Sequence, residues 1–248
     1  MIIINGELDS HNKIILDEGF IFGRAIFETI LVKKDALFLK EHIERINSSA
    51  KTLGINNSLT EEYILTLIKK YTISNCALKI ILSPENIVLT TRDIPYNTSH
   101  YEKGFSLNVS NILKNETSSL PFHKWTGYLE NIFIREEAVK KGFNDSILIN
   151  TKGFISETST ANIFFIKNNT IHTPNINSGI LNGIIRNWII SNYKVIEGNF
   201  TLDDLITSDG VFITNSLVGI IKIKKINTST ISDNNLILQL SKDYSNIK

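Results

Sequence analysis

Segments patterned as helices alternate with segments patterned as strands along the whole 248-residue chain, and this alternation limits the fold more than any other feature. Apolar residues recur at helical spacing between Leu39 and Leu53, and Gly54 offers a favourable helix end. The apolar runs Cys76–Leu82 and Ile87–Thr91 are short and bounded by turn residues, as is typical of strands. Because strands and helices interleave throughout, we predict an α/β (α+β) fold in two lobes.

Turn and capping residues predict further elements near the N-terminus. Met1–Ile4 followed by Asn5-Gly6 predicts a β-hairpin, since this dipeptide suits a type I′ turn. The run Phe20–Val32 predicts a buried strand. Ser58 and Glu61 match a capping box, which predicts the start of a second helix.

A polar segment divides the chain. Residues 112–120 lack periodicity, so we predict that they link an N-terminal lobe, residues 1–111, to a C-terminal lobe, residues 121–248. In the C-terminal lobe, helices are predicted at 129–142 and 184–193. The first of these is marked by the apolar residues Leu129, Ile132, Phe133 and Val139. Strands are predicted at 146–150, 162–167, 170–172, 210–215 and 220–226.

Composition disfavours several classes of function. The net charge of +1 gives no electrostatic basis for binding nucleic acid or an anionic membrane. No apolar run approaches the roughly 20 residues that a membrane-spanning helix needs. The single cysteine, Cys76, fits a reducing cytoplasm, and the five scattered histidines lack the spacing of a metal site. We therefore expect a cytoplasmic protein with no metal centre and no nucleic-acid or membrane partner.

Lys124 could serve as a nucleophilic amine. It lies between Phe122 and Trp125, and such aromatic neighbours can exclude water from an amine, which lowers its pKa and frees it for attack. A lysine that binds a carbonyl cofactor also needs a carboxylate that keeps the cofactor's pyridine nitrogen protonated. Glu157, in the tract Ile155–Phe165, is a candidate. Read without any relative, both side chains suit ordinary surface positions as well.

Three segments could bind a phosphate. Gly183 precedes a predicted helix, and the amides at such a helix start attract anions. Asn215 and Ser216 follow a predicted strand with small polar side chains. Arg45 lies to one side of the apolar stripe of its helix and can point into a cleft. Each signal has an ordinary alternative, since Arg45 also suits a solvated helix face and Gly183 a simple turn.

Taken together, these segments resemble the fold-type IV pyridoxal-phosphate (PLP) enzymes. That family contains branched-chain aminotransferases, D-amino-acid aminotransferases and 4-amino-4-deoxychorismate lyases. The order and spacing of the matching stretches are more specific than any one of them. The stretches are FGRAIFETI, EHIERINSSAKTLGI, HKWTGYLEN, GFISETSTANIFFI, HTPNINSGILNGIIR and VFITNSLVGI.

The resemblance implies a small N-terminal α/β lobe, a larger C-terminal lobe with a barrel-like sheet, and a homodimer. It assigns the aldimine and the proton transfers to Lys124, and the pyridine nitrogen to Glu157. Asn162 would support the loop that carries Glu157, and Tyr128 would lie near the cofactor's phenolic oxygen.

The same resemblance implies a cradle for the cofactor phosphate. Arg45 would contribute its guanidinium, Ile184 and Ile185 their backbone amides, and Asn215 and Ser216 their turn.

The cofactor alone does not decide the reaction. The short chain and the loop sequences around Gly183 and Asn215 resemble lyase versions, with Thr29 a catalytic candidate that contacts substrate. This favours a lyase that acts on an amino substrate, 4-amino-4-deoxychorismate, and releases pyruvate and 4-aminobenzoate, a folate precursor. A branched-chain or D-amino-acid aminotransferase is the alternative, and a non-catalytic family member is a third reading. Arg24 departs from the family pattern and suits either a substrate carboxylate or solvent.

Overall fold

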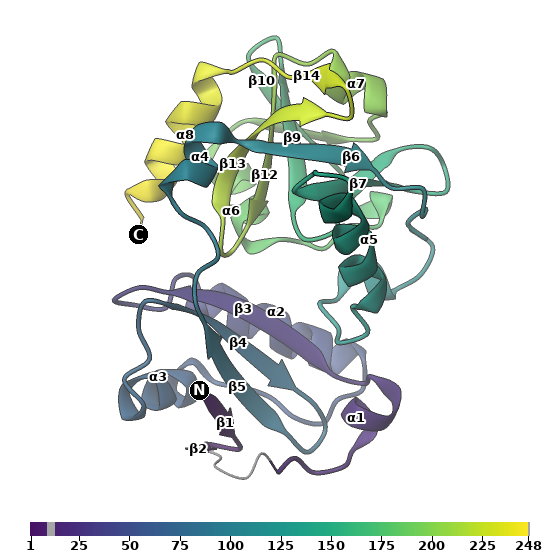
Figure 1. Ribbon diagram of the computed structural model, residues 1–248. Helices are drawn as coiled ribbons and strands as arrows, with labels where there is room; N and C mark the ends of the chain where they lie inside the picture. Colours follow the sequence, from purple (N-terminus) through teal and green to yellow (C-terminus); the bar gives the residue numbers. More distant parts are fainter. Residues whose placement is uncertain (9–12, 248) are drawn as a thin grey trace. The chain divides into compact units, whose positions relative to one another are not determined.

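The computed structural model describes residues 1–8 and 13–247, which form two compact units (Figure 1). Unit 1 comprises Met1–Pro95 and His123–Gly127. Unit 2 comprises Tyr96–Phe122 and the chain from Tyr128 onward. The predicted linker, residues 112–120, lies within unit 2 in this division. No helix among the described residues is long and apolar enough to cross a membrane.

Unit 1 is an antiparallel sheet, and two of its three described helices pack on one face of it (Figure 1). The strands follow the order β2-β1-β5-β4-β3. They are β1 (Ile2–Ile4), β2 (Glu7–Leu8), β3 (Ile26–Val32), β4 (Cys76–Leu82) and β5 (Ile87–Arg92). The helices are α1 (Glu18–Phe22), α2 (Leu39–Thr52) and α3 (Glu61–Lys70).

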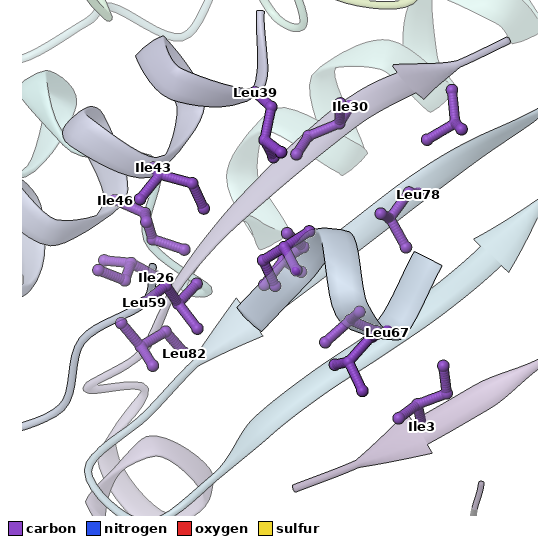
Figure 2. Close-up of a cluster of buried hydrophobic side chains, with 14 of the residues drawn as sticks. Ile3, Ile26, Ile30, Leu39, Ile43, Ile46, Leu59, Leu67, Leu78 and Leu82 are labelled. Atoms are coloured by element: carbon purple, nitrogen blue, oxygen red, sulfur yellow. The ribbon is translucent and has the colours of Figure 1, made fainter. Parts of the chain in front are cut away.

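Alternation along β3 and β4 separates the two faces of this sheet. Ile26, Ile30 and Leu78 pack against α2 and α3 in a continuous apolar core (Figure 2). Phe27 and Thr29 point to the opposite face, because side chains along a strand alternate. The unit therefore has one face that holds the fold together and one face with side chains available for other roles.

The structure of unit 1 confirms one prediction made from the sequence and corrects two. The N-terminal hairpin is confirmed, with Asn5 and Gly6 in left-handed conformations. The predicted strand begins only at Ile26, because Glu18–Phe22 forms a helix that Asp17 caps. The second helix begins after Thr60, whose hydroxyl accepts the Tyr63 amide, so the predicted Ser58 cap is wrong.

Unit 2 is built on a mixed sheet whose described strands follow the order β11-β10-β9-β12-β13-β6-β7-β8, with β14 beside β13. The strands are β6 (Phe105–Val109), β7 (Asp145–Ile149), β8 (Ile155–Thr158), β9 (Asn162–Lys167), β10 (Thr170–Pro174), β11 (Val195–Gly198), β12 (Gly210–Asn215), β13 (Gly219–Ile226) and β14 (Ser229–Thr230). Although β8 ends the order, it also contacts β9 and β10. The sheet thus curls on itself, as the predicted barrel-like sheet requires.

Helices and short 3-10 turns surround this sheet (Figure 1). They are α4 (Thr98–Lys103), η1 (Leu120–Phe122), α5 (Leu129–Lys140), η2 (Ile176–Ser178), α6 (Ile184–Asn192), α7 (Leu202–Ile206) and α8 (Asn235–Ser245). Helix α5 is present as predicted, but it buries Ile134 and Ala138 instead of the four residues that marked it. Leu129, Ile132, Phe133 and Val139 are exposed.

Candidate functional site

The segment that carries Lys124 is bound to the edge strand of unit 1. The Phe27 amide donates to the Lys124 carbonyl over 2.7 Å, and the Thr126 amide donates to Ala25 over 2.9 Å. Trp125 forms an isolated bridge with Ile26 and packs against the core. Backbone pairing therefore fixes where the Lys124 side chain begins.

The Lys124 amine lies against an aromatic ring. Its Nζ is 4.4 Å from the ring centroid of Phe27, and Nζ of Lys79 is also 4.4 Å from that centroid. Thr29 pairs directly with Lys79 across β3 and β4, so the two side chains share the face on which Phe27 stands. Burial lowers the pKa of Lys79, and the charge of Arg92 lowers it further. Unit 1 therefore brings Lys124 and Thr29, two predicted catalytic residues, to one cationic and aromatic face.

Arg45 is held by a carboxylate on the opposite face of the same strand. Its Nε donates to Oε1 of Glu28 and its Nη2 to Oε2, each over 2.7 Å. Nδ1 of His42 lies 2.6 Å from Oε2 of Glu28. Burial alone would raise the pKa of Glu28, but the interactions with Arg45 and His42 outweigh burial and bring that pKa to about 2. Arg45 was singled out from the sequence but Glu28 was not, since its only signal is that Ile26 and Ile30, two positions to either side, are apolar.

Glu157 lies in unit 2 on the irregular β7–β8 pair. Ile147 pairs with Thr158 and Ile149 with Ile155, so the register shifts across Glu157. Such a bulge redirects a side chain. Oε2 of Glu157 accepts from the Leu181 amide over 3.1 Å and from Nδ2 of Asn162 over 3.2 Å. The carboxylate is buried and fixed by donors, as a group that holds a cation in place should be.

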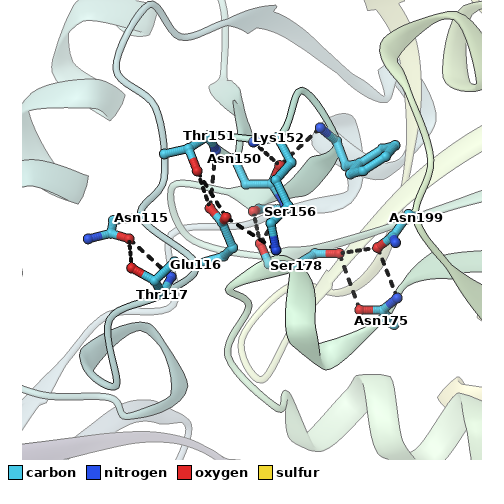
Figure 3. Close-up of polar contacts among 11 residues, drawn as sticks. Asn115, Glu116, Thr117, Asn150, Thr151, Lys152, Ser156, Asn175, Ser178 and Asn199 are labelled. Carbon is cyan, nitrogen blue, oxygen red and sulfur yellow. Dashed lines mark hydrogen bonds and ion pairs between the residues drawn. The ribbon is translucent and has the colours of Figure 1, made fainter.

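Lys114 also pairs with Glu157, with 3.2 Å between Nζ and Oε1. The Lys114 amide donates to Ile149 over 2.8 Å, which fastens this segment beside β7. Two residues further on, Glu116 accepts from the amide and the hydroxyl of Thr151 (Figure 3). Lys114 was not predicted as a site residue, because a lysine in a polar stretch carries no pattern that indicates burial.

Asn162 links Glu157 to the start of α6. Besides Glu157, its Nδ2 donates to the Leu181 carbonyl over 2.8 Å. A Cβ at Gly183 would lie 2.0 Å from Oδ1 of Asn162, so a larger residue there would have to displace the Asn162 side chain. Helix α6 begins directly after Gly183, without a side-chain cap. The amides of the first helical turn have no partner within the helix, so those of Ile184 and Ile185 suit an anion.

The turn after β12 contributes a second polar edge. Oδ1 of Asn215 accepts from the amides of Leu217 and Val218, and its Nδ2 donates to the Thr160 carbonyl over 3.3 Å. The side chain of Asn215 therefore shapes the turn that Ser216 occupies. The buried hydroxyl of Thr214, just before this turn, has no hydrogen-bond partner among the described residues. An unsatisfied buried hydroxyl is costly, so this edge is suited to a polar ligand.

Tyr128 and Arg24 have structural partners. The Tyr128 hydroxyl donates to the Ser159 carbonyl over 2.9 Å, and this carbonyl also accepts from Asn131. Tyr128 thus supports the turn that follows Glu157. Arg24 pairs with Glu18 over 2.8 Å, and both side chains are about half exposed. Of the two readings of Arg24, the structure favours the surface one.

The chain is similar to proteins of one enzyme family. Residues 25–226 match the family described as amino-transferase class IV. The aminodeoxychorismate lyase of Bacillus subtilis (strain 168) is 29% identical over 91% of this chain and 86% of the lyase. A protein of Aquifex aeolicus (strain VF5), named a probable branched-chain-amino-acid aminotransferase, is 28% identical over 88% of this chain and 81% of its own length.

Solved structures share the fold. The branched-chain amino acid aminotransferase of Escherichia coli matches 99% of this chain and 93% of its own, with a TM-score of 0.90 at 19% identity. At this identity the likeness shows the fold alone. It confirms the predicted fold type, with its mixed architecture and curled sheet.

Proposed function

Because the chain belongs to the amino-transferase class IV family of PLP-dependent enzymes, we propose that it is a 4-amino-4-deoxychorismate lyase that releases pyruvate and 4-aminobenzoate. Family membership confirms the predicted cofactor, PLP. The similarity to the Bacillus subtilis lyase over 91% of this chain supports the proposed reaction.

The residues of each unit fit PLP. We assign the phosphate to Arg45, to the amides of Ile184 and Ile185, and to the turn of Asn215 and Ser216. Two observations support the unit 2 part: the buried Thr214 hydroxyl has no hydrogen-bond partner among the described residues, and α6 begins at Ile184 without a side-chain cap.

We assign the protonated pyridine nitrogen to Glu157, whose carboxylate is already fixed by Lys114, Asn162 and the Leu181 amide. Bound PLP supplies an electron sink for the carbon that carries the substrate's amine. Tyr128 supports this site through the Ser159 carbonyl.

Lys124 acts as the base in this proposal. Its amine takes the proton from the amine-bearing carbon of the substrate, and the bond from the neighbouring ring carbon to the enolpyruvyl oxygen then breaks. The ring becomes aromatic, and the released enolpyruvate takes up a proton to give pyruvate. The Phe27 ring shields one side of the Lys124 amine from water. Thr29 is placed on the same sheet face, where its hydroxyl can contact the substrate.

One observation favours a substrate with two carboxylates, namely the positive charge around Lys124. Lys79 shares the Phe27 ring with Lys124, and Arg92 interacts with Lys79. Aminodeoxychorismate carries two carboxylates, which cations at this face can bind. The apolar side chain of a branched-chain amino acid gains nothing from such cations.

An aminotransferase remains the second candidate because the identity to the Aquifex aeolicus protein, 28%, is nearly the same. Its amino acceptor, 2-oxoglutarate, would also carry two carboxylates to the cationic face. In that reaction Lys124 returns the proton to the cofactor, and the substrate leaves as an oxo acid.

A product assay separates the two reactions. Purified enzyme is given aminodeoxychorismate in one series, and L- or D-amino acids with 2-oxoglutarate in the other. The lyase releases 4-aminobenzoate and pyruvate in equal amounts. Amino transfer without either product would overturn the lyase proposal, and neither activity together with no PLP absorbance would indicate a non-catalytic protein.

We also propose that the protein is a homodimer. Phe20, Ile21 and Phe22 on α1 are exposed, as are Ile15 and Leu16 just before it. A contiguous exposed apolar patch of this kind marks an interaction surface. Light scattering at micromolar concentration tests this, and Phe22→Glu should shift a dimer toward monomer.

A further inference from the structure

The contact between Glu28 and Arg45 is more specific than an ordinary ion pair. Two parallel hydrogen bonds, each of 2.7 Å, join the Nε–Nη2 edge of the guanidinium to the carboxylate. The Glu28 side chain is 2% exposed and that of Arg45 is 15% exposed. A two-point contact to a planar group fixes the direction of its plane as well as its distance.

His42 fixes the carboxylate in turn. Its ring is fully buried, and Nδ1 lies 2.6 Å from the oxygen of Glu28 that also accepts from Nη2 of Arg45. Glu28 is a β3 residue, while His42 and Arg45 lie one turn apart on the same face of α2. The carboxylate therefore has few other orientations open to it.

Burying such a cluster of charged groups contributes little net stability to the fold. A buried ion pair loses hydration that its own attraction barely repays, and apolar residues in its place are often as stable. The neighbouring residues Ile26 and Ile30 on the same face of β3 belong to the apolar core. A carboxylate at position 28 is thus better explained by what it does to Arg45 than by the stability of the core.

We propose that Glu28 is a positioning residue for the cofactor phosphate: it fixes the plane of the Arg45 guanidinium and so the direction in which Arg45 meets the phosphate. This inference rests on the assignment of Arg45 to the phosphate in the proposed function. An arginine whose rotamers are already restricted loses less side-chain entropy on binding an anion. Glu28 itself contacts no part of the cofactor in this scheme.

A competing effect has the opposite sign. Glu28 is negative, so its removal also strengthens the attraction between Arg45 and a phosphate. If positioning dominates, loss of Glu28 weakens phosphate binding; if charge dominates, it strengthens it. Whether loss of Glu28 weakens or strengthens phosphate binding therefore decides between positioning and charge.

The experiment compares two ligands of the apoprotein, PLP and pyridoxal, which lacks the phosphate. Dissociation constants are measured from absorbance titrations without substrate, for wild type, Glu28→Gln and Glu28→Asp. We expect the preference for PLP over pyridoxal to fall about tenfold in Glu28→Gln, the effect of one lost charge-assisted hydrogen bond. Glu28→Asp keeps the charge but is one methylene too short for the two-point contact, so it should show a fall of similar size.

Two further variants provide the reference points. Arg45→Ala gives the preference that remains without the guanidinium. Glu18→Gln breaks the exposed pair with Arg24 in the same unit and should leave the preference unchanged. General damage to the fold would weaken both ligands equally and so would not move their ratio.

An unchanged or increased preference for PLP in both Glu28 variants would overturn the inference. So would an unchanged preference in Arg45→Ala, since Arg45 would then not bind the phosphate. Neither result depends on which reaction the enzyme catalyses, because no substrate is present. A failed lyase assay with a reduced PLP preference would therefore leave the positioning role intact.

Discussion

Lys114 and Glu157 form an ion pair of 3.2 Å in which the side chains are only 11% and 9% exposed. The two residues are 43 positions apart in the chain, and pairing of the Lys114 backbone with β7 brings them together. One carboxylate oxygen of Glu157 thus pairs with Lys114, and the other accepts hydrogen bonds from Asn162 and the Leu181 amide.

Lys114→Met should destabilise the protein markedly. Loss of one partner from a buried ion pair leaves an uncompensated charge and costs about 3 kcal/mol or more. We expect this loss in the unfolding free energy of the cofactor-free protein, measured by urea denaturation. Saturating PLP should reduce the deficit, because the pyridinium assigned to Glu157 supplies another positive charge.

Lys140→Met is the matched control for that change. Its Nζ lies 2.7 Å from Oε1 of Glu137, and the two side chains are 69% and 56% exposed. An ion pair between two exposed side chains contributes little to stability. If Lys114→Met were no more harmful than Lys140→Met, the Lys114–Glu157 pair would not be important for stability.

Gly183→Ala should disturb Glu157 through Asn162. The backbone at Gly183, with φ −71° and ψ 143°, suits alanine, so the whole effect comes from the contact of 2.0 Å with Oδ1 of Asn162. We expect a loss of about 2 kcal/mol in unfolding free energy, within the usual range for overpacking, and weaker PLP binding. Both are measurable by urea denaturation and absorbance titration.

A double-mutant cycle checks the cause of that loss. In an Asn162→Ala background the offending oxygen is gone, so adding Gly183→Ala should cost almost nothing. Equal costs in both backgrounds would show that alanine at position 183 acts in another way. Gly142→Ala is a second control, because a Cβ there meets nothing within 4 Å and only the φ of +82° opposes it.

Sequence patterns predicted the local elements of this chain better than its long-range contacts. The helical spacing between Leu39 and Leu53 and the strand-like run Cys76–Leu82 correspond to α2 and β4. Helix α5 shows the limit, since its apolar residues Phe133 and Val139 are exposed. Apolar content indicates a helix, but only the neighbouring strands decide which face is buried.

In the candidate site, too, single residues were predicted better than the contacts between them. Lys124 and Arg45 were identified from tracts that resemble a family, yet their partners were not. Phe27 contacts Lys124 because a short segment pairs with the edge of β3, and Glu28 contacts Arg45 because β3 packs beneath α2. Such contacts depend on register and packing, which no local pattern in the sequence encodes.

Lys124→Ala should abolish the visible absorbance that PLP acquires when it is bound to a lysine. The wild-type band should also disappear on treatment with borohydride. Lys79→Ala is a close control, since both amines lie 4.4 Å from the centroid of the same Phe27 ring. Retention of the band in Lys124→Ala and its loss in Lys79→Ala would show that the wrong lysine has been assigned.

Glu28 should make the stability of the wild type depend on pH. Its pKa is about 2 in the folded protein against an ordinary value of 4.5, because the interactions with Arg45 and His42 outweigh burial. A carboxyl group whose pKa is lowered by folding stabilises the folded protein fully at pH values above its unfolded-state pKa. For Glu28 this stabilisation is lost as the pH falls from 4.5 toward 2. Glu28→Gln removes the titration, so its deficit in unfolding free energy should be largest above about pH 5.5 and smaller by about 1.4 kcal/mol at pH 3.5, one pKa unit below the unfolded value. Urea denaturation of both proteins between pH 7 and pH 3.5 measures the difference, and parallel curves over that range would mean that folding does not lower the pKa of Glu28.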